Sequence, residues 1–379
     1  MSGNGKAFCE KLDHDLVFFD GSMGTMLQSG GPASAPLINK PPSGWKVPEE
    51  LNLTSPDTIA EIHRLYLEAG SDVILTNTFG ANRLKLEESG LDTGAVISAA
   101  VALARKAVSS FEGRFVALDI GPTGKLLEPM GSTGFDEVYE AFAEAAKAGE
   151  AAGADIAVIE TMSDLYELKA AVLAVKENTS LPVIASATFL DTNRTLTGAD
   201  PATVVAVLEG LGAVAVGFNC GGDLAHAGQL AKSFLAEASV PVFMEPNAGI
   251  PAIENGQAVF RVSAREFAEK VCECAKLGIR VLGDAAEQDL NILRPWLKPA
   301  GICLLFLFFR STKRLFPPGP IQLKSGLLSI PEAKALLLWA NGSIRPAKNV
   351  LRKPYSIMIS SMYCPRPGTR LPPGPMSLM

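Results

Sequence analysis

Long apolar runs are missing from this chain of 379 residues. The longest, residues 302–309, is far shorter than the roughly 20 residues that a membrane-spanning helix needs. The first 15 residues are polar and charged, and they lack the apolar core of a secretory signal peptide. The sequence therefore predicts no membrane partner and a cytoplasmic location.

Cysteine and histidine are also scarce. The six cysteines stand at positions 9, 220, 272, 274, 303 and 364, a spacing that does not resemble a disulfide framework. We expect reduced thiols. None of the three histidines, His14, His63 and His226, falls in a motif with a cysteine for which it could act as a base. We interpret all three as structural or solvated residues.

Basic residues are few over residues 1–283, where 36 acidic and 21 basic side chains give a net charge of −15. This balance argues against a nucleic-acid partner bound through its phosphates. Beyond Gly283 the pattern reverses to 4 acidic and 13 basic residues, with 13 of the 26 prolines. The change predicts a boundary near Gly283. A basic tail that associates with membranes or nucleic acid is an alternative supported by this charge alone.

Short apolar runs recur between helical stretches, which is typical of βα units around a parallel sheet. Eight runs over about 280 residues predict an α/β fold, a (β/α)₈ TIM barrel. A doubly wound sheet is the alternative, but no GxGxxG follows the first run. No amphipathic helix follows the eighth run, so we expect the eighth helix to be missing or replaced by an irregular tail. The runs are 16–20, 72–77, 115–122, 155–161, 182–189, 213–220, 240–249 and 279–283.

Polar residues and glycines end nearly every predicted strand, and in a barrel these ends form the active face. The carboxylates of Asp20, Glu160 and Glu245 would suit a cation such as an α-amino group. Glycine-rich turns would offer backbone N–H donors to an α-carboxylate. We therefore expect a small zwitterionic ligand. The strand ends are Asp20-Gly21, 76–78, Asp119 with Gly121-Pro122, Glu160-Thr161, Asn219-Cys220 and 245–247.

Three cysteines invite a chemical interpretation. Cys220 ends a strand, where a lone cysteine is more often a small buried residue than a ligand or nucleophile. Cys272 and Cys274 form a CxC inside a helical pattern over 263–277, so their side chains point in different directions. That pair is interpreted as structural, on the outside of the barrel.

Several motifs resemble one known family. DGSMGTMLQ, DIGPTGKLLEPMG, IETMSDLYELKAA, GFNCG and EPNAGIPAIENG, with the long segment from ELNLTSPD to ANRLKL, resemble the homocysteine S-methyltransferase domain. They are most similar to the N-terminal homocysteine-binding module of cobalamin-dependent methionine synthases. The match spans residues 12–283 in order. It implies a TIM barrel over 1–283.

The resemblance also implies a zinc ion held by three cysteine thiolates, of which Cys220 would be the first. An adjacent pair is expected in Gly-Gly-Cys-Cys-Gly-Thr, followed closely by Pro-Glu-His, starting at Gly283. This chain instead has GDAAEQD from Gly283, so both expected thiolates are absent. Neither Asp284 nor Glu287 is expected to replace them, because thiolate sites are soft.

The departure has a simple interpretation in the other reading frame. Codons for GDAAEQDLNI, started at the third base of the Gly283 codon, permit Gly-Cys-Cys-Gly-Thr, then Arg or Gly, then Pro-Glu-His and Ile. We therefore predict that residues 284–379 are an out-of-frame, largely unstructured tail. A genuine lineage-specific tail is the alternative.

The resemblance implies a methyltransferase of the methionine synthase type. Zinc-bound homocysteine thiolate would attack a methyl group, with methylcobalamin on a separate module as the expected donor and a folate module in the intact relatives. The expected substrate-binding residues are Asp20, Gly21, Thr78, Glu160, Asn219, Glu245 and Asn247, with Cys220 as the metal ligand. Because two thiolates are absent, we expect zinc binding and activity to be lost. The alternative is a non-catalytic barrel that binds homocysteine or methionine.

Overall fold

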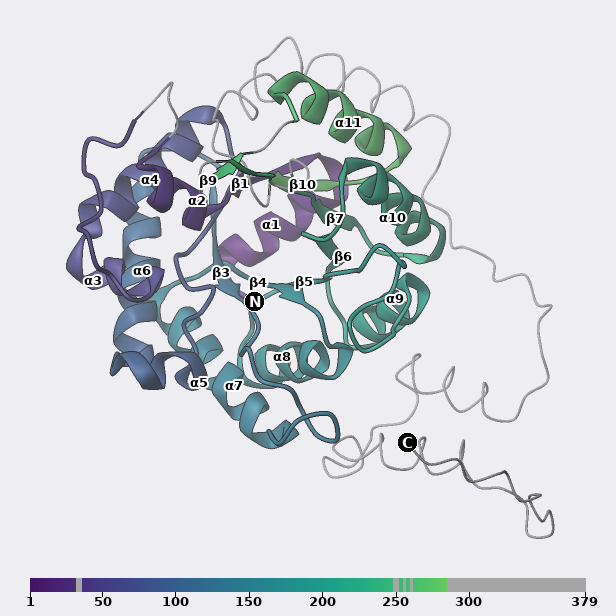
Figure 1. Ribbon diagram of the computed structural model, residues 1–379, viewed down its shortest axis with the longest axis horizontal. Coiled ribbons are helices and arrows are strands. Elements are labelled where there is room, and N and C mark those ends of the chain that lie inside the picture. Colours follow the sequence, from purple (N-terminus) through teal and green to yellow (C-terminus); the bar gives the residue numbers. More distant parts are fainter. Residues whose placement is uncertain (32–35, 248–251, 255–256, 260–261, 285–379) are drawn as a thin grey trace, which may run out of the picture. The chain divides into compact units, whose positions relative to one another are not determined.

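A closed barrel of eight parallel strands dominates the computed structural model, which describes residues 1–31, 36–247, 252–254, 257–259 and 262–284. Around the barrel the strands follow the order β1-β10-β7-β6-β5-β4-β3-β2 (Figure 1). The predicted (β/α)₈ fold is confirmed, and the doubly wound alternative is wrong because the sheet closes. The strands are β1 (Val17–Gly21), β2 (Val73–Leu75), β3 (Phe115–Ile120), β4 (Ile156–Met162), β5 (Val183–Ala187), β6 (Ala215–Asn219), β7 (Val242–Glu245) and β10 (Val281–Asp284).

The division at Gly283 remains a prediction. Asp284 completes β10, opposite Gly21 of β1. The rest of the predicted tail, 285–379, and with it the question of an eighth helix, lies outside the described residues.

Helices surround the barrel, and their ends follow from the local sequence. Asp223 accepts a hydrogen bond from the backbone N–H of His226 at 2.8 Å and so begins α10. Gly70 and Gly153, both with positive φ, end α4 and α7. The helices are α1 (Gly3–His14), α2 (Met23–Ser29), α3 (Leu51–Thr54), α4 (Pro56–Ala69), α5 (Arg83–Leu86), α6 (Thr93–Val108), α7 (Phe135–Ala152), α8 (Leu165–Asn178), α9 (Pro201–Gly210), α10 (Leu224–Glu237) and α11 (Ala264–Leu277), with short 3₁₀ turns η1 (Pro48–Glu50) and η2 (Glu87–Ser89).

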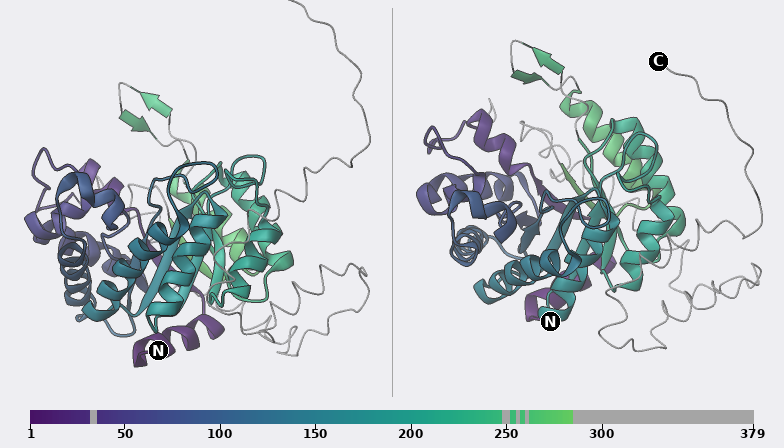
Figure 2. Two further views of the ribbon diagram at one scale, coloured as in Figure 1. Left: turned by 90° about the horizontal axis from the view of Figure 1, so that it is seen from below. Right: turned by 60° about the horizontal axis from the view of Figure 1, so that its bottom comes forward.

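Two elements were not foreseen in the sequence. Helix α1 lies across the amino ends of the strands (Figure 2). Its residues Phe8 and Leu12 join the core inside the barrel. The Phe8 ring meets Phe115 edge-on at 5.4 Å between centroids. After β7, strands β8 (Ala252–Glu254) and β9 (Gln257–Val259) pair antiparallel as a separate hairpin. No helix in the described part of the chain is both long and apolar enough to cross a bilayer.

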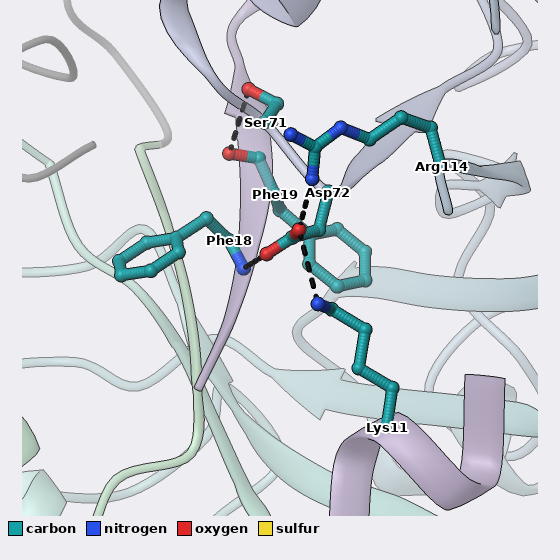
Figure 3. A network of polar contacts seen from close by, with 6 residues as sticks. All are labelled: Lys11, Phe18, Phe19, Ser71, Asp72 and Arg114. Atoms are coloured by element: carbon teal, nitrogen blue, oxygen red, sulfur yellow. Dashed lines mark hydrogen bonds and ion pairs between the residues drawn. The ribbon is translucent and has the colours of Figure 1, made fainter. Parts of the chain in front are cut away.

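Charged groups at the amino ends of the strands are paired (Figure 3). Asp72 accepts a hydrogen bond from the backbone N–H of Phe18 at 3.0 Å and forms ion pairs with Lys11, at 3.3 Å, and with Arg114. Asp155 is bound in the same manner by the backbone of Val116 and by Arg105. Residues at this end of a TIM barrel generally serve stability, and the satisfied carboxylates agree with that role.

Candidate functional site

A cavity of about 490 Å³ opens at the carboxyl ends of the strands. The carboxyl ends of the strands supply five of its six acidic side chains and a thiol, and the sixth acid, Glu49, lies on η1. The segments after β1 and β2 supply most of the other residues of the wall, both apolar and polar. The lining residues are Asp20, Gly21, Ser22, Met23, Gly24, Val47, Pro48, Glu49, Leu75, Thr76, Asn77, Phe79, Gly80, Lys85, Asp119, Glu160, Thr161, Cys220, Glu245 and Asp284.

Three buried carboxyl groups in this cavity have an oxygen without a hydrogen-bond partner in the described structure. They are Asp20, Asp119 and Glu245, which are 2%, 7% and 2% exposed. The second oxygen of Asp20 accepts from the backbone N–H of Leu75 at 3.0 Å. Buried polar atoms are normally satisfied, so these oxygens indicate places where a ligand would donate. By contrast, the carboxylate of Asp72 at the other end of the barrel is hydrogen-bonded and ion-paired.

Burial raises the pKa of four of the acids that line the cavity. Desolvation is the first cause for Asp20, Asp119, Glu160 and Glu245, and the negative charges of neighbouring acids raise the pKa of Asp20, Asp119 and Glu245 further. Asp119 and Glu160 also share a hydrogen bond, which requires a proton on one of the two carboxyl groups. A cation that enters the cavity would favour the charged forms.

Asn219 holds Glu160 in place from beneath the cavity. Its Nδ2 donates to Glu160 at 2.6 Å and to the hydroxyl of Thr161 at 2.7 Å. Its Oδ1 accepts from the backbone N–H of Thr161 and from the hydroxyl of Ser186, both at 2.8 Å. The side chain is 1% exposed. Asn219 therefore orients the acid rather than facing the cavity itself.

Cys220 stands at the edge of this network, with its Sγ 4.0 Å from the Thr161 hydroxyl and 3.7 Å from Asn219 Nδ2. Burial, followed by the charge of Glu160, raises the pKa of the thiol to about 12. Both Cys220 and Thr161 have positive φ, 54° and 59°, a conformation that costs energy for residues other than glycine. Strained residues of this kind cluster at functional sites.

The structure brings five of the eight expected site residues onto one cavity wall: Asp20, Gly21, Glu160, Cys220 and Glu245. Thr78 lies behind the wall, where its hydroxyl donates to the backbone oxygen of Asp119 at 2.7 Å. Asn219 lies beneath it. Asn247 is half-buried just after β7 and is absent from the lining.

Several lining residues were not among the expected site residues. Asp119 is the last residue but one of β3, so it lies at the carboxyl end of a strand like the three expected acids. Lys85 on α5 carried no such signal, because only the folded path of the segment after β2 brings it to the cavity. Tyr66 of α4 does not line the cavity but packs against Gly21, which does, and an added Cβ on Gly21 would stand 3.0 Å from the Tyr66 hydroxyl.

The thiolate site implied by the resemblance does not fit the residues that the structure describes. Within those residues no group of three or more His, Cys, Asp or Glu side chains is arranged to hold a metal ion. Cys9, Cys272 and Cys274 lie on α1 and α11, and none of them lines the cavity with Cys220. The two positions after Asp284 are alanines.

Comparisons with known proteins point to one family. The family model described as homocysteine S-methyltransferase matches residues 17–285. The methionine synthase of Mycobacterium leprae is 32% identical over 289 residues, which cover 72% of this chain and 23% of that protein. That of Mycobacterium tuberculosis is 32% identical over 285 residues, with the same coverage. The chain thus spans less than a quarter of the length of these curated relatives.

Solved structures support the fold. The crystal structure of the homocysteine methyltransferase MmuM from Escherichia coli in its oxidized form matches with a TM-score of 0.62 and 23% identity, covering 77% of this chain and 98% of that one. Its metallated form matches with the same TM-score and identity, and covers 99% of that chain.

Proposed function

Because the chain belongs to the homocysteine S-methyltransferase family, we propose that its cavity binds L-homocysteine for methyl transfer to the substrate sulfur. The observation that carries this proposal is the set of buried, unpartnered carboxyl oxygens of Asp20, Asp119 and Glu245 beside Cys220. An α-ammonium group has three N–H donors and a positive charge, and it matches such a set of acceptors.

In this proposal the positions of the acidic side chains determine how the substrate is oriented in the cavity. Its ammonium group faces Asp20 and Glu160, and its thiol points toward Cys220. Entry of the ammonium group displaces protons from carboxyl groups whose pKa is raised in the empty cavity. Gly283 keeps room for the Glu245 carboxyl group, because a Cβ there would stand 2.2 Å from its oxygen.

Activation of the thiol is the step that this chain is proposed to lack. A thiol is a weak nucleophile at neutral pH, and a zinc ion held by three thiolates would deprotonate it. This chain offers Cys220 and has alanines at 285 and 286. We propose that the loss arose through a one-base shift after Gly283, which resequencing the gene would test.

The first prediction concerns metal content and activity. The purified full chain should hold far less than one zinc ion per molecule, and it should not methylate L-homocysteine from methylcobalamin, S-methylmethionine or betaine. A matched protein in which the frame at Gly283 is restored to Gly-Cys-Cys-Gly-Thr should bind about one zinc ion and gain activity. Elemental analysis and a methionine assay measure both properties.

Stoichiometric zinc with homocysteine-dependent turnover in the unaltered chain would contradict the proposed loss. If the restored protein also lacks activity while both proteins bind homocysteine in calorimetry, the alternative of a non-catalytic binding barrel is favoured. The methyl donor and its cobalamin and folate modules belong, in this proposal, to the parts of the longer relatives that this chain does not cover.

A further inference from the structure

Lys85 is the only basic side chain among the described residues that line the cavity. Its backbone N–H donates to the side chain of Asn82 at 3.1 Å, which fixes the start of α5. Its ammonium group lies 5.0 Å from the centroid of the Phe79 ring, a cation–π distance. In the part of the chain that the structure describes, this ammonium group has no hydrogen bond and no ion pair within 4 Å.

Two of the acids around Lys85, Glu49 and Glu167, accept hydrogen bonds from other residues. Glu49 accepts a hydrogen bond from the backbone N–H of Gly80 at 2.5 Å. Glu167 accepts two from Thr123, at 2.5 and 2.7 Å. Burial lowers the pKa of Lys85, and the charges of Glu49, Glu167 and Asp119 oppose that shift without contact. A half-buried ammonium group that contacts an aromatic ring but has no carboxylate within ion-pair distance is suited to bind an anion.

We infer that Lys85 binds the α-carboxylate of the amino-acid substrate, an inference that rests on the proposed function. The ammonium and carboxylate groups of an amino acid are attached to one carbon, so the groups that bind them must be neighbours. Lys85 and Glu160 meet this condition through Asp119, which is near both of them. The charge of Asp119 acts on Lys85, and its carboxyl group shares a hydrogen bond with Glu160. The carboxylate then faces Lys85, the ammonium group faces Glu160, and the side chain extends toward Cys220.

This assignment also explains how an acidic cavity admits a zwitterion. In their charged forms, Asp20, Asp119, Glu160 and Glu245 attract an ammonium group but repel a carboxylate. Lys85 offsets that repulsion at one place, so it selects α-amino acids over simple amines of the same length.

The test compares two ligands that differ only in the carboxylate, L-homocysteine and 3-aminopropane-1-thiol. Calorimetry on the full chain should show a preference for L-homocysteine of about 10- to 100-fold, the value of one charge-assisted hydrogen bond. Lys85→Met should erase that preference and leave the affinity for the amine unchanged or higher. Lys85→Arg should retain most of it. Lys106→Met, an exposed charge on α6, is the matched control and should retain all of it.

The outcomes separate this inference from the function on which it rests. If wild type prefers L-homocysteine and Lys85→Met keeps that preference, the role of Lys85 is overturned and the proposed function stands. If Lys85→Met loses affinity for both ligands equally, Lys85 shapes the cavity and does not bind the carboxylate. That result also overturns the inference. If wild type binds neither ligand, both proposals fall.

Discussion

At the scale of single residues, the Asn219 side chain connects Glu160, Thr161 and Ser186 by hydrogen bonds. We predict that Asn219→Ala lowers the free energy of unfolding by about 2–4 kcal/mol, because it removes four hydrogen bonds to oxygen and nitrogen atoms, one of them to Glu160, and a longer one to Cys220 Sγ. It should also weaken homocysteine binding. Urea unfolding and calorimetry measure the two effects.

Ser186→Ala is the matched control, since it removes only one of those hydrogen bonds. A loss of about 1 kcal/mol is expected for it. Equal losses in the two variants would show that Asn219 does not organise the network.

Residue type and position made part of this site predictable. Asp20, Glu160 and Glu245 each lie within the last three residues of a buried strand, and parallel strands bring their carboxyl ends to one face. Whether a residue faces the cavity or lies behind it was not predictable, as Thr78 and Asn219 show, because that depends on partners from other strands. The position of Lys85 at the cavity was not predictable either, because it depends on the path of the whole segment after β2.

At the scale of elements, α4 buries a histidine that does not suit its surroundings. His63 is fully buried, and neither ring nitrogen has a partner within the described residues. Burial lowers its pKa to about 4, whereas an unfolded chain protonates it near 6.5. Between these values the unfolded state holds more protons, so the free energy of unfolding decreases as the pH falls from 6.5 to 4.

We predict that His63→Leu reduces this acid-induced loss by about 3 kcal/mol and leaves the protein as stable or more stable at pH 7. Chemical unfolding across the pH range measures the difference. His14→Gln, which replaces an exposed histidine on α1, is the matched control. An unaltered profile in His63→Leu would contradict the assignment.

The strands were predictable as elements because each is a short apolar run between helices. Helix α1 was not, because most of its residues are polar and only Phe8 and Leu12, one turn apart, reveal an inner face. These two side chains pack against the core inside the barrel, and that core exists only once the tertiary contacts have closed the barrel.

At the scale of the whole molecule, the two ends of the barrel differ in charge compensation. The cavity acids hold protons in the folded state that an unfolded chain releases near the ordinary values of 3.8 to 4.5. The folded state therefore binds more protons, and the free energy of unfolding decreases as the pH rises above that range. Each carboxyl group that stays protonated contributes up to about 1.4 kcal/mol per pH unit.

We predict that the ligand-free protein loses stability from pH 6.5 to 8, where His63 no longer contributes, and that Glu245→Gln makes this slope shallower. Thermal unfolding at several pH values provides the measurement. Glu112→Gln, at an exposed turn, is the control. A slope that does not change in Glu245→Gln would show that this carboxyl group is already ionised in the folded protein.

The pairing of β1 with β10 has a consequence for synthesis on the ribosome. Val17 and Phe18 pair in register with Val281 and Leu282. During synthesis this pairing can form only after more than 260 further residues have been translated. Until then β1 and β7 present open edges that can pair with other chains. The proposed shift of frame follows Gly283, after Leu282, so the nascent chain still receives the residues that close the barrel.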